Sequence, residues 1–267
     1  MTVDAPSVTH ELGIHPLTGG SGPLVIAVHG AEGSWREWQP LAAVLDGRCR
    51  LVAVDLPWRA GNDYRWGLRG SPGNWLGRAV GRLDEPVRAV LGHSLGGNAV
   101  LEWLSTGGTL QPAAALLLAP FYRPPEDQVD EALEREFRAA FRYAVSDGIR
   151  TALGTRFERL DTRLFESMVD TALDRVGEGG LGVLFRQFVA TGSFDVASVR
   201  IPTRVLVGEA DPALIERRGT ALARAMPAAT VSYRPDYRHC FHISHADEIA
   251  AELADFLAGA APLGASE

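Results

Sequence analysis

The chain has 267 residues, a length that fits one large α/β domain or a core domain with an inserted segment. Hydrophobic residues make up 46% of it and charged residues 22%, which excludes the composition of a disordered protein. The net charge is -7 and all basic residues are scattered arginines, so no basic stripe is available for a phosphate backbone. We therefore expect no nucleic-acid partner.

Cysteine usage and the length of the apolar runs bear on the compartment. Cys49 and Cys240 lack CxxC spacing, so the sequence predicts neither a disulfide framework nor a zinc site and fits a reducing environment. The N-terminus has no basic segment followed by an apolar one, and the longest apolar runs are too short to span a bilayer. We expect a cytoplasmic protein with no metal, no cofactor and no membrane partner.

Short apolar runs alternate with longer helical patterns, which is typical of a mostly parallel central sheet flanked by helices, the α/β class. An antiparallel edge hairpin is expected around residues 8–17. The buried strands that follow have near-continuous apolar character, which indicates helices on both faces of the sheet. In chain order they are Leu24–Val28, Leu51–Val54, Val87–Leu91, Ala113–Ala119, Thr203–Val207 and Thr230–Arg234.

The loop over residues 55–75 is unusually rich in tryptophan and arginine. One interpretation is a structured surface loop whose aromatic side chains pack on the core. The other is that Arg59 and Arg65 bind an anionic or carrier-bound substrate, because guanidinium groups match the geometry of carboxylates and phosphates.

A serine stands in a glycine-rich turn, Gly92-His93-Ser94-Leu95-Gly96, between an expected strand and a helix-compatible stretch. Flanking glycines permit a strained turn that presents the serine hydroxyl at the end of the sheet. A GxSxG pattern also arises by chance in a loop, but the strand before it and the helix after it favour a nucleophile.

The sequence pattern changes over residues 122–199, which show charged helical patterns and no strand-like run. Apolar spacings of three and four residues predict one helix face over residues 129–144 and another over residues 157–173. An insertion at this point of a parallel sheet would lie over the carboxyl ends of the strands. We therefore predict a core of residues 1–121 and 200–267 covered by a helical cap.

The start of this cap suggests the character of the substrate. Aromatic residues at its entry and within it suggest a largely apolar acyl or aromatic substrate, although aromatic residues on cap helices more often serve packing. They are Phe121 and Tyr122 at the entry and Phe137, Phe141, Phe157 and Phe165 in the cap.

A serine nucleophile needs a base and an acid that orients the base. Asp211 lies in the turn after the expected strand Thr203–Val207, which Pro212 terminates. His239 follows the last expected strand and stands closest to its carboxyl end, where the serine should also emerge. Alternatives remain open on spacing alone: His242 and His245 for the base, and Glu126, Asp127 and Asp236 for the acid.

Acyl transfer also requires backbone N–H groups that bind the developing oxyanion. One donor is expected to be the amide of Leu95, at a helix N-terminus, and the other that of Ala31 in the turn after the first buried strand. Gly30 lets the backbone turn sharply there and His29 is expected to brace the loop. We expect His29, Gly30 and His93 to lie at the substrate.

With these residues in hand, the chain resembles the α/β-hydrolase fold superfamily over nearly its whole length. The resemblance rests on the segments GGSGPLVIAVHG, GHSLGG, VGEADP and HCFHISHADEIAAEL, in that order. It implies a triad of Ser94, Asp211 and His239, oxyanion amides at Ala31 and Leu95, and a cap over residues 122–199. Dehalogenases and epoxide hydrolases of this superfamily carry an aspartate where Ser94 stands, so those reactions are disfavoured.

The expected activity is serine hydrolysis of a carboxylic ester or thioester through an acyl-enzyme, acting on a small-molecule or carrier-bound acyl substrate. Two other classes stay open because fold does not fix function. One is a non-hydrolytic enzyme of the same fold, such as a lyase, cyclase or cofactor-free oxygenase. The other is a ligand-binding protein without turnover.

Overall fold

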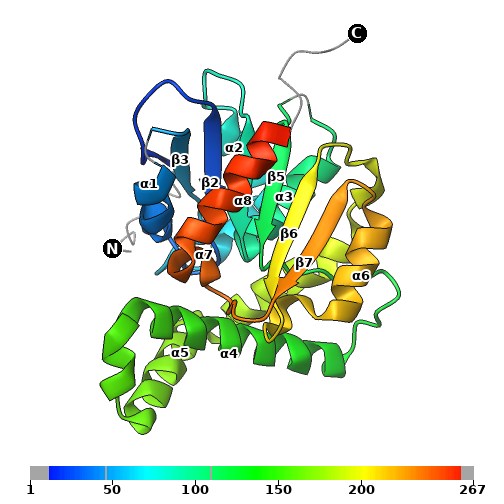
Figure 1. The fold of residues 1–267 in the computed structure, drawn as a ribbon. Helices are drawn as coiled ribbons and strands as arrows, with labels where there is room; N and C mark the ends of the chain where they lie inside the picture. The colour runs from blue at the N-terminus through cyan, green and yellow to red at the C-terminus, as the bar shows by residue number, and fades with distance from the viewer. Residues whose placement is uncertain (1–11, 46, 109, 260–267) are drawn as a thin grey trace, which may run out of the picture.

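The computed structural model describes residues 12–45, 47–108 and 110–259 (Figure 1). Seven strands form one sheet in the order β1-β3-β2-β4-β5-β6-β7. Among the described strands, only β1 (Gly13–Pro16) runs antiparallel to its neighbour. The others are β2 (Leu24–Val28), β3 (Arg50–Asp55), β4 (Ala89–His93), β5 (Ala114–Leu118), β6 (Thr203–Gly208) and β7 (Ala229–Arg234).

The expected fold class is confirmed. Each of the six buried strands lies within two residues of its predicted bounds, the largest shift being that of β4. In the expected edge hairpin, β1 pairs with β3 rather than with β2, and residues 8–11 lie outside the described part of the chain.

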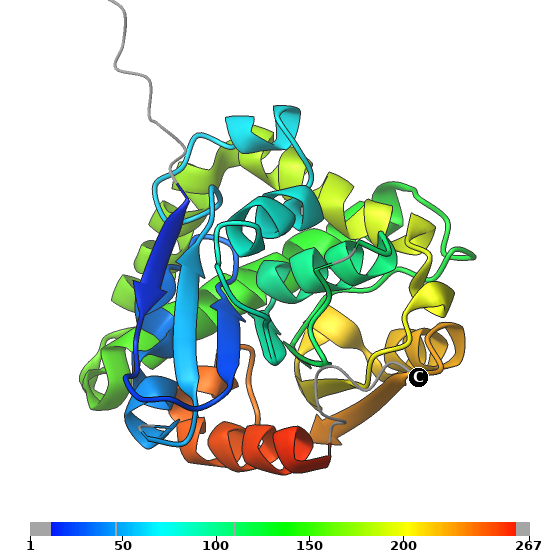
Figure 2. The same ribbon diagram turned by 90° about the horizontal axis from the view of Figure 1, so that it is seen from above.

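Side chains alternate between the two faces of each strand, and in the central strands both sets are apolar and buried. Helices therefore cover both faces of the sheet. Ile26 and Val28 pack into one core cluster, with α2 (Pro72–Val80), α3 (Leu95–Ser105) and α6 (Glu216–Ala225). Val25 and Ala27 face the opposite cluster, with α1 (Gln39–Leu45) and α8 (Ala246–Gly259), as Figure 2 shows from above. All four of these strand residues are fully buried.

Between β5 and β6 the chain forms a helical insertion at one end of the sheet (Figure 1). It consists mainly of α4 (Glu131–Leu153) and α5 (Thr162–Ala190), joined by the short 3-10 helix η3 (Gly154–Arg159). Asp130 and Asp161 cap the two helices by accepting hydrogen bonds from N–H groups of the first turn. In α5 the helical path is interrupted at Gly177, whose φ of 61° suits a residue without a Cβ.

The helix faces predicted for this insertion hold only in part. The predicted face of α4 is buried through Leu133, Phe137, Ala140 and Phe141, but Val129 precedes the helix and is exposed. The second face is wrong at most of its positions. Phe157 and Leu160 precede α5 and Leu164 is 53% exposed, whereas Leu173 packs against the core. The neighbouring Phe165 and Val169 are buried. Two apolar stripes run side by side on α5, and tertiary packing selects the one that is buried.

The remaining elements are short: η1 (Trp35–Trp38), η2 (Arg65–Leu68), η4 (Thr191–Ser193), η5 (Val196–Ser198), η6 (Pro212–Leu214) and α7 (Phe241–Ser244). None of the helices in the described ranges combines the length and the apolar character needed to cross a membrane.

Candidate active site

Ser94 occupies a strained turn between β4 and α3. Its φ of 52° and ψ of -120° lie outside the regions that residues with a side chain prefer. The flanking glycines are required sterically, since a Cβ on Gly92 would lie 2.6 Å from the carbonyl oxygen of Gly96 and a Cβ on Gly96 would collide with the carbonyl oxygen of Val28. Close packing of the turn on β2 therefore fixes the direction of the serine side chain.

The structure brings Ser94, His239 and Asp211 together. His239 Nε2 lies 3.0 Å from Ser94 Oγ, and His239 Nδ1 lies 2.8 Å from Asp211 Oδ2. The second carboxylate oxygen of Asp211 accepts a hydrogen bond of 2.9 Å from the Ala213 N–H at the start of η6. All three residues are at least 95% buried, so their geometry is set by protein contacts.

The electrostatics of His239 suit a base held by a carboxylate. Burial alone would lower the pKa of this imidazole, but the charge of Asp211 and its hydrogen bond raise the pKa above the ordinary value. Because Asp211 Oδ2 can only accept when ionised, the neutral ring carries its proton on Nδ1. Its Nε2 lone pair is then directed at the Ser94 hydroxyl.

The loop after β2 packs directly against Ser94. A Cβ on Gly30 would lie 3.2 Å from Ser94 Cβ, and the next residue, Ala31, lines the cavity above the serine. The Leu95 N–H lies at the first residue of α3, where backbone N–H groups have no partner within the helix. Both predicted amide donors therefore lie next to Ser94.

His29 supports this loop by hydrogen bonds and is not among the residues that line the cavity. It is fully buried; its Nε2 accepts a hydrogen bond of 2.9 Å from the Leu56 N–H, so its Nδ1 donates to the Gly30 carbonyl at 2.8 Å. The bond from Leu56 joins the ends of β2 and β3, and the bond to Gly30 fixes the turn after β2.

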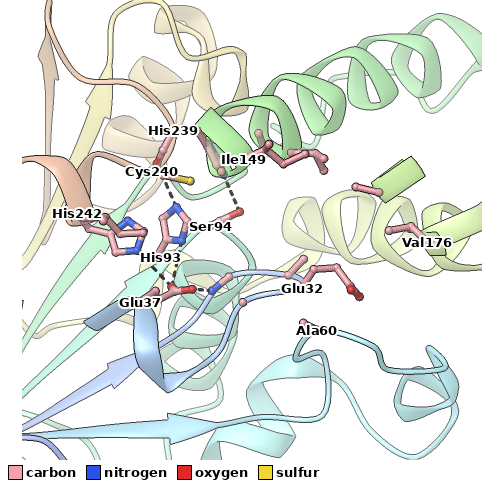
Figure 3. Close-up of a pocket in the computed structure, with 18 of the residues that line it drawn as sticks. Glu32, Glu37, Ala60, His93, Ser94, Ile149, Val176, His239, Cys240 and His242 are labelled. Atoms are coloured by element: carbon pink, nitrogen blue, oxygen red, sulfur yellow. Dashed lines mark hydrogen bonds and ion pairs between the residues drawn. The ribbon is translucent and has the colours of Figure 1, made fainter. Parts of the chain in front are cut away.

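A cavity of about 380 Å³ opens over Ser94 (Figure 3). One wall comes from the core, through residues that include Gly30, Ala31, His93, Ser94 and His239. The facing wall is mostly apolar and comes from the helical insertion, through Ala144, Val145, Ile149, Ala172 and Val176. The insertion thus supplies much of the surface that a ligand of Ser94 would touch.

The other residues predicted to contact the substrate are not among those that line this cavity. Phe121 lies beside His239, with ring centroids 6.2 Å apart, and lines a second cavity beyond it. Tyr122 is buried in the core. Arg65 is largely exposed and pairs with Asp63 at 3.7 Å, while Arg59 is half-buried beside the cavity-lining Ala60.

The loop that carries these arginines is anchored by its aromatic side chains. Trp58 and Trp66 are fully buried, and Trp75 and Tyr64 are nearly so. The Tyr64 hydroxyl also donates to Glu32 Oε1 at 2.8 Å. Core packing therefore accounts for most of the aromatic content of the loop.

The rival histidines have other surroundings. His242 is fully buried and faces Glu37, and its ring lies against that of His93 at a centroid distance of 3.9 Å and a tilt of 33°. His245 precedes α8, and its Nδ1 lies 2.9 Å from the hydroxyl of Ser244. Neither of them takes the place of His239 between Ser94 and a carboxylate.

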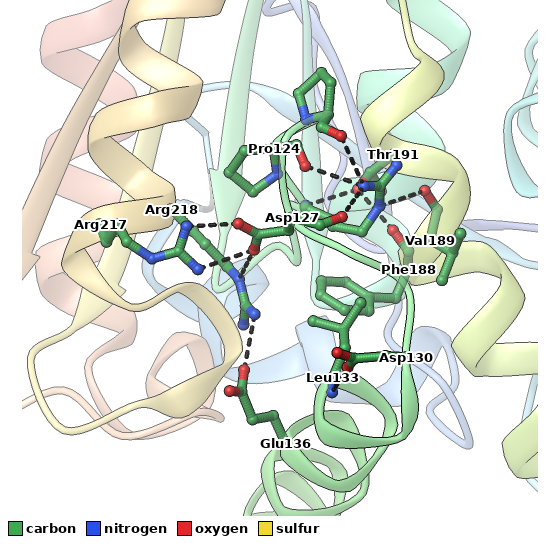
Figure 4. A network of polar contacts seen from close by, with 12 residues as sticks. Pro124, Asp127, Asp130, Leu133, Glu136, Phe188, Val189, Thr191, Arg217 and Arg218 are labelled. Carbon is green, nitrogen blue, oxygen red and sulfur yellow. Dashed lines mark hydrogen bonds and ion pairs between the residues drawn. The ribbon is translucent and has the colours of Figure 1, made fainter.

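The rival acids have other partners or are exposed. Asp127 joins the insertion to α6 by accepting bonds of 2.6 Å from Arg217 and 3.0 Å from Arg218 (Figure 4), which lower its pKa. Glu126 and Asp236 are exposed. The network around Asp127 is structural, because Arg218 is buried and also reaches Glu136 at 2.8 Å.

Sequence reasoning missed a buried aspartate on α4. Asp147 is 1% exposed and accepts a 2.8 Å hydrogen bond from the Cys240 N–H and another from Arg238 Nε. It thereby ties the insertion to the residues on both sides of His239. An aspartate 93 positions away from its partner gives no spacing signal, so no pattern in the sequence could have found it.

Asn98 is a second residue that the pattern did not identify. Its Nδ2 donates to the Phe121 carbonyl at 2.8 Å, and its Oδ1 accepts from the Phe121 N–H at 2.9 Å. Both polar atoms of the side chain are satisfied, which locks α3 to the segment after β5. The helix that begins directly after Ser94 is therefore held against the segment that follows β5.

Comparison with known proteins agrees with this architecture. A model of the alpha/beta hydrolase family matches residues 25–252. No curated protein sequence matches the chain. Among solved structures, the enol-lactonase from Burkholderia xenovorans superposes with a TM-score of 0.62 at 17% identity, covering 92% of this chain and 96% of that one.

Two further structures show the same fold. A thermophilic esterase from Thermogutta terrifontis has a TM-score of 0.59 at 20% identity, covering 92% of this chain and 93% of its own. The bromoperoxidase from Bacillus anthracis has a TM-score of 0.63 at 22% identity, with 92% and 94% covered. Since the family model spans most of the sequence and the sheet is mostly parallel with helices on both faces, the chain belongs to the alpha/beta hydrolase family.

Proposed function

We propose that this protein is a serine hydrolase that cleaves a carboxylic ester or thioester through an acyl-enzyme. The observation that carries the proposal is the buried relay of 3.0 and 2.8 Å from Ser94 through His239 to Asp211, placed beside a cavity. The strained turn at Ser94 has the form of a nucleophile elbow, which exposes a serine above the sheet.

In the first step His239 Nε2 takes the proton of Ser94 as the hydroxyl oxygen attacks the acyl carbon. Asp211 keeps the ring in the tautomer that can accept this proton and stabilises the imidazolium that forms. The N–H groups of Leu95 and Ala31 hydrogen-bond to the oxyanion of the tetrahedral intermediate. His239 then gives the proton to the leaving alcohol or thiol.

In the second step water replaces the leaving group. His239 takes a proton from this water, whose oxygen attacks the acyl carbon, and the proton returns to Ser94 as the acid is released. The helical insertion, acting as a cap, would limit access of bulk water and shape the acyl site. No step in this scheme requires a metal or an organic cofactor.

The cavity supports an acyl substrate of modest size. Its insertion wall is apolar except for Arg175, and its volume is at the lower end of the range for small-molecule sites. We therefore propose a small-molecule or carrier-bound acyl compound as the substrate. The two cysteines are free and buried, which agrees with a reaction in the cytoplasm.

Steady-state hydrolysis of matched esters and thioesters tests this function. A series of p-nitrophenyl esters and of acyl thioesters with increasing acyl length should reveal turnover with a preferred length. Ser94→Ala should abolish turnover while leaving the melting temperature close to that of the wild type. Turnover that survives in Ser94→Ala, or no turnover across both series by the folded protein, would contradict the proposal.

A further inference from the structure

Two buried histidines and a partly buried glutamate converge on one point in the wall of the Ser94 cavity. They are Glu37 from η1, His93 from the end of β4 and His242 from α7 (Figure 3). One ligand atom from each lies within 4.8 Å of the other two. The two histidines are 5% and 0% exposed, and all three residues line the cavity.

The tautomer of His93 is fixed by its other neighbour. His93 Nε2 lies 3.1 Å from the carbonyl oxygen of His239, which can only accept, so Nε2 carries a proton and donates it. In the neutral ring, His93 Nδ1 then bears a lone pair. That lone pair lies 3.4 Å from Glu37 Oε1, itself an acceptor.

His242 makes the same kind of contact. Its Nε2 lies 3.3 Å from Glu37 Oε1. Within the described ranges, neither His93 Nδ1 nor either nitrogen of His242 has a hydrogen-bond partner. A buried nitrogen without a partner costs about 1–3 kcal/mol, so the two that face Glu37, His93 Nδ1 and His242 Nε2, call for an occupant.

Protons alone satisfy this arrangement poorly. A proton on His242 serves one contact with Glu37 and leaves the contact of His93 unpaired. To satisfy the second contact, His93 would have to donate from both ring nitrogens, which makes it a cation beside the His242 ring, at a centroid distance of 3.9 Å. A single divalent cation would accept a lone pair from each of the three residues at once.

The distances fit such an ion. Nitrogen and oxygen ligands lie about 2.0–2.2 Å from tetrahedral zinc, which places neighbouring ligand atoms roughly 3.3–3.5 Å apart. The two contacts of Glu37 Oε1, at 3.3 and 3.4 Å, have this spacing. Two imidazoles and one carboxylate form a donor set that zinc prefers, and the cavity gives access for the ion and for a fourth ligand from solvent.

We propose that Glu37, His93 and His242 form a binding site for a zinc-type divalent cation, with Glu37 and two imidazoles as protein ligands. The site would join three segments that also carry the Ser94 machinery: the loop after β2, the turn before Ser94 and the segment after His239. The Gly30 N–H donates to Glu37 Oε1 at 3.2 Å, so the cation would also stiffen the loop of Ala31. This inference stands apart from the proposed hydrolysis.

Metal titration of the purified full-length protein tests the site. After chelator treatment and desalting, calorimetry with Zn²⁺ should give one equivalent per chain, and Co²⁺ should produce the visible absorption of a tetrahedral ion. Glu37→Gln keeps the shape of the side chain and removes its charge, and His242→Gln removes one imidazole. Each should weaken zinc binding by more than about 100-fold, beyond the loss typical of outer-shell changes.

Cys240→Ser is the matched control, because Cys240 is the thiol that lines the same cavity and it should bind zinc as the wild type does. If a ligand variant fails to fold, X-ray absorption of the zinc-loaded wild type decides the question. Nitrogen and oxygen neighbours with an imidazole signature are expected. No stoichiometric zinc in the wild type, unchanged binding in the folded ligand variants, or a sulfur neighbour would overturn the proposal, whereas labelling of Ser94 would be unaffected.

Discussion

Replacing Asp211 by asparagine should invert the tautomer of His239 while leaving the fold intact. Asp211 Oδ1 accepts the Ala213 N–H at 2.9 Å, so the carbonyl oxygen of an asparagine is held at that position. The amide nitrogen then takes the place of Oδ2, 2.8 Å from His239 Nδ1, and it can only donate. His239 Nδ1 must become the acceptor, which moves the ring proton to Nε2.

A protonated Nε2 cannot accept the proton of Ser94, so the base is lost although no heavy atom has moved. We expect kcat/KM to fall by about 10⁴-fold, the loss associated with a wrong tautomer in such a triad. This corresponds to about 5 kcal/mol of transition-state stabilisation. Both hydrogen bonds of the residue are retained, so the free energy of unfolding should change by less than about 1 kcal/mol.

The assay is hydrolysis of an activated ester by wild type and Asp211→Asn, with urea unfolding measured on both. Nitrogen-15 NMR of the imidazole should show the proton on Nδ1 in the wild type and on Nε2 in the variant. A variant that keeps activity within tenfold of the wild type, with native stability, would refute the argument that Asp211 sets the tautomer.

Three further predictions concern pH and packing. Burial lowers and the neighbouring carboxylate raises the pKa of His239, with a net rise, so kcat/KM should increase with pH through a midpoint above 6.5; a midpoint below 6.5 in a pH profile would contradict this. Gly96→Ala should cost more than about 3 kcal/mol of unfolding free energy in urea titrations, since its Cβ collides with backbone, and a change under 1 kcal/mol would be inconsistent. Asp147→Ala strands the buried Cys240 N–H, so kcat should fall about 10-fold or more with wild-type ester affinity; native kcat would show that Asp147 does not position His239.

The strands and the relay could be predicted because each depends on local chemistry. A buried parallel strand is a short apolar run, and β2 shows this with bounds that agree at both ends. The turn of Ser94 needs glycines for a steric reason that leaves its mark in the sequence, and Asp211 and His239 each follow a strand that ends at the same edge. Parallel topology then brings the three segments together.

What could not be predicted depends on contacts between distant segments. Glu37 reads as a surface residue of a polar stretch, and only packing of η1 against α7 brings it to His93 and His242. The buried stripe of α5 is set by its neighbours, which is why Leu164 is exposed and Phe165 is not. Such choices among equivalent local patterns are made by tertiary structure.

Reaction with a fluorophosphonate probe tests the central claim most directly, because only an activated serine displaces its leaving group. Intact-protein mass followed by peptide mapping should give one adduct, on Ser94, that is absent from Ser94→Ala and strongly slowed in Asp211→Asn. A folded protein that gains no adduct, or gains it at another serine, would contradict the account of Ser94 as the nucleophile.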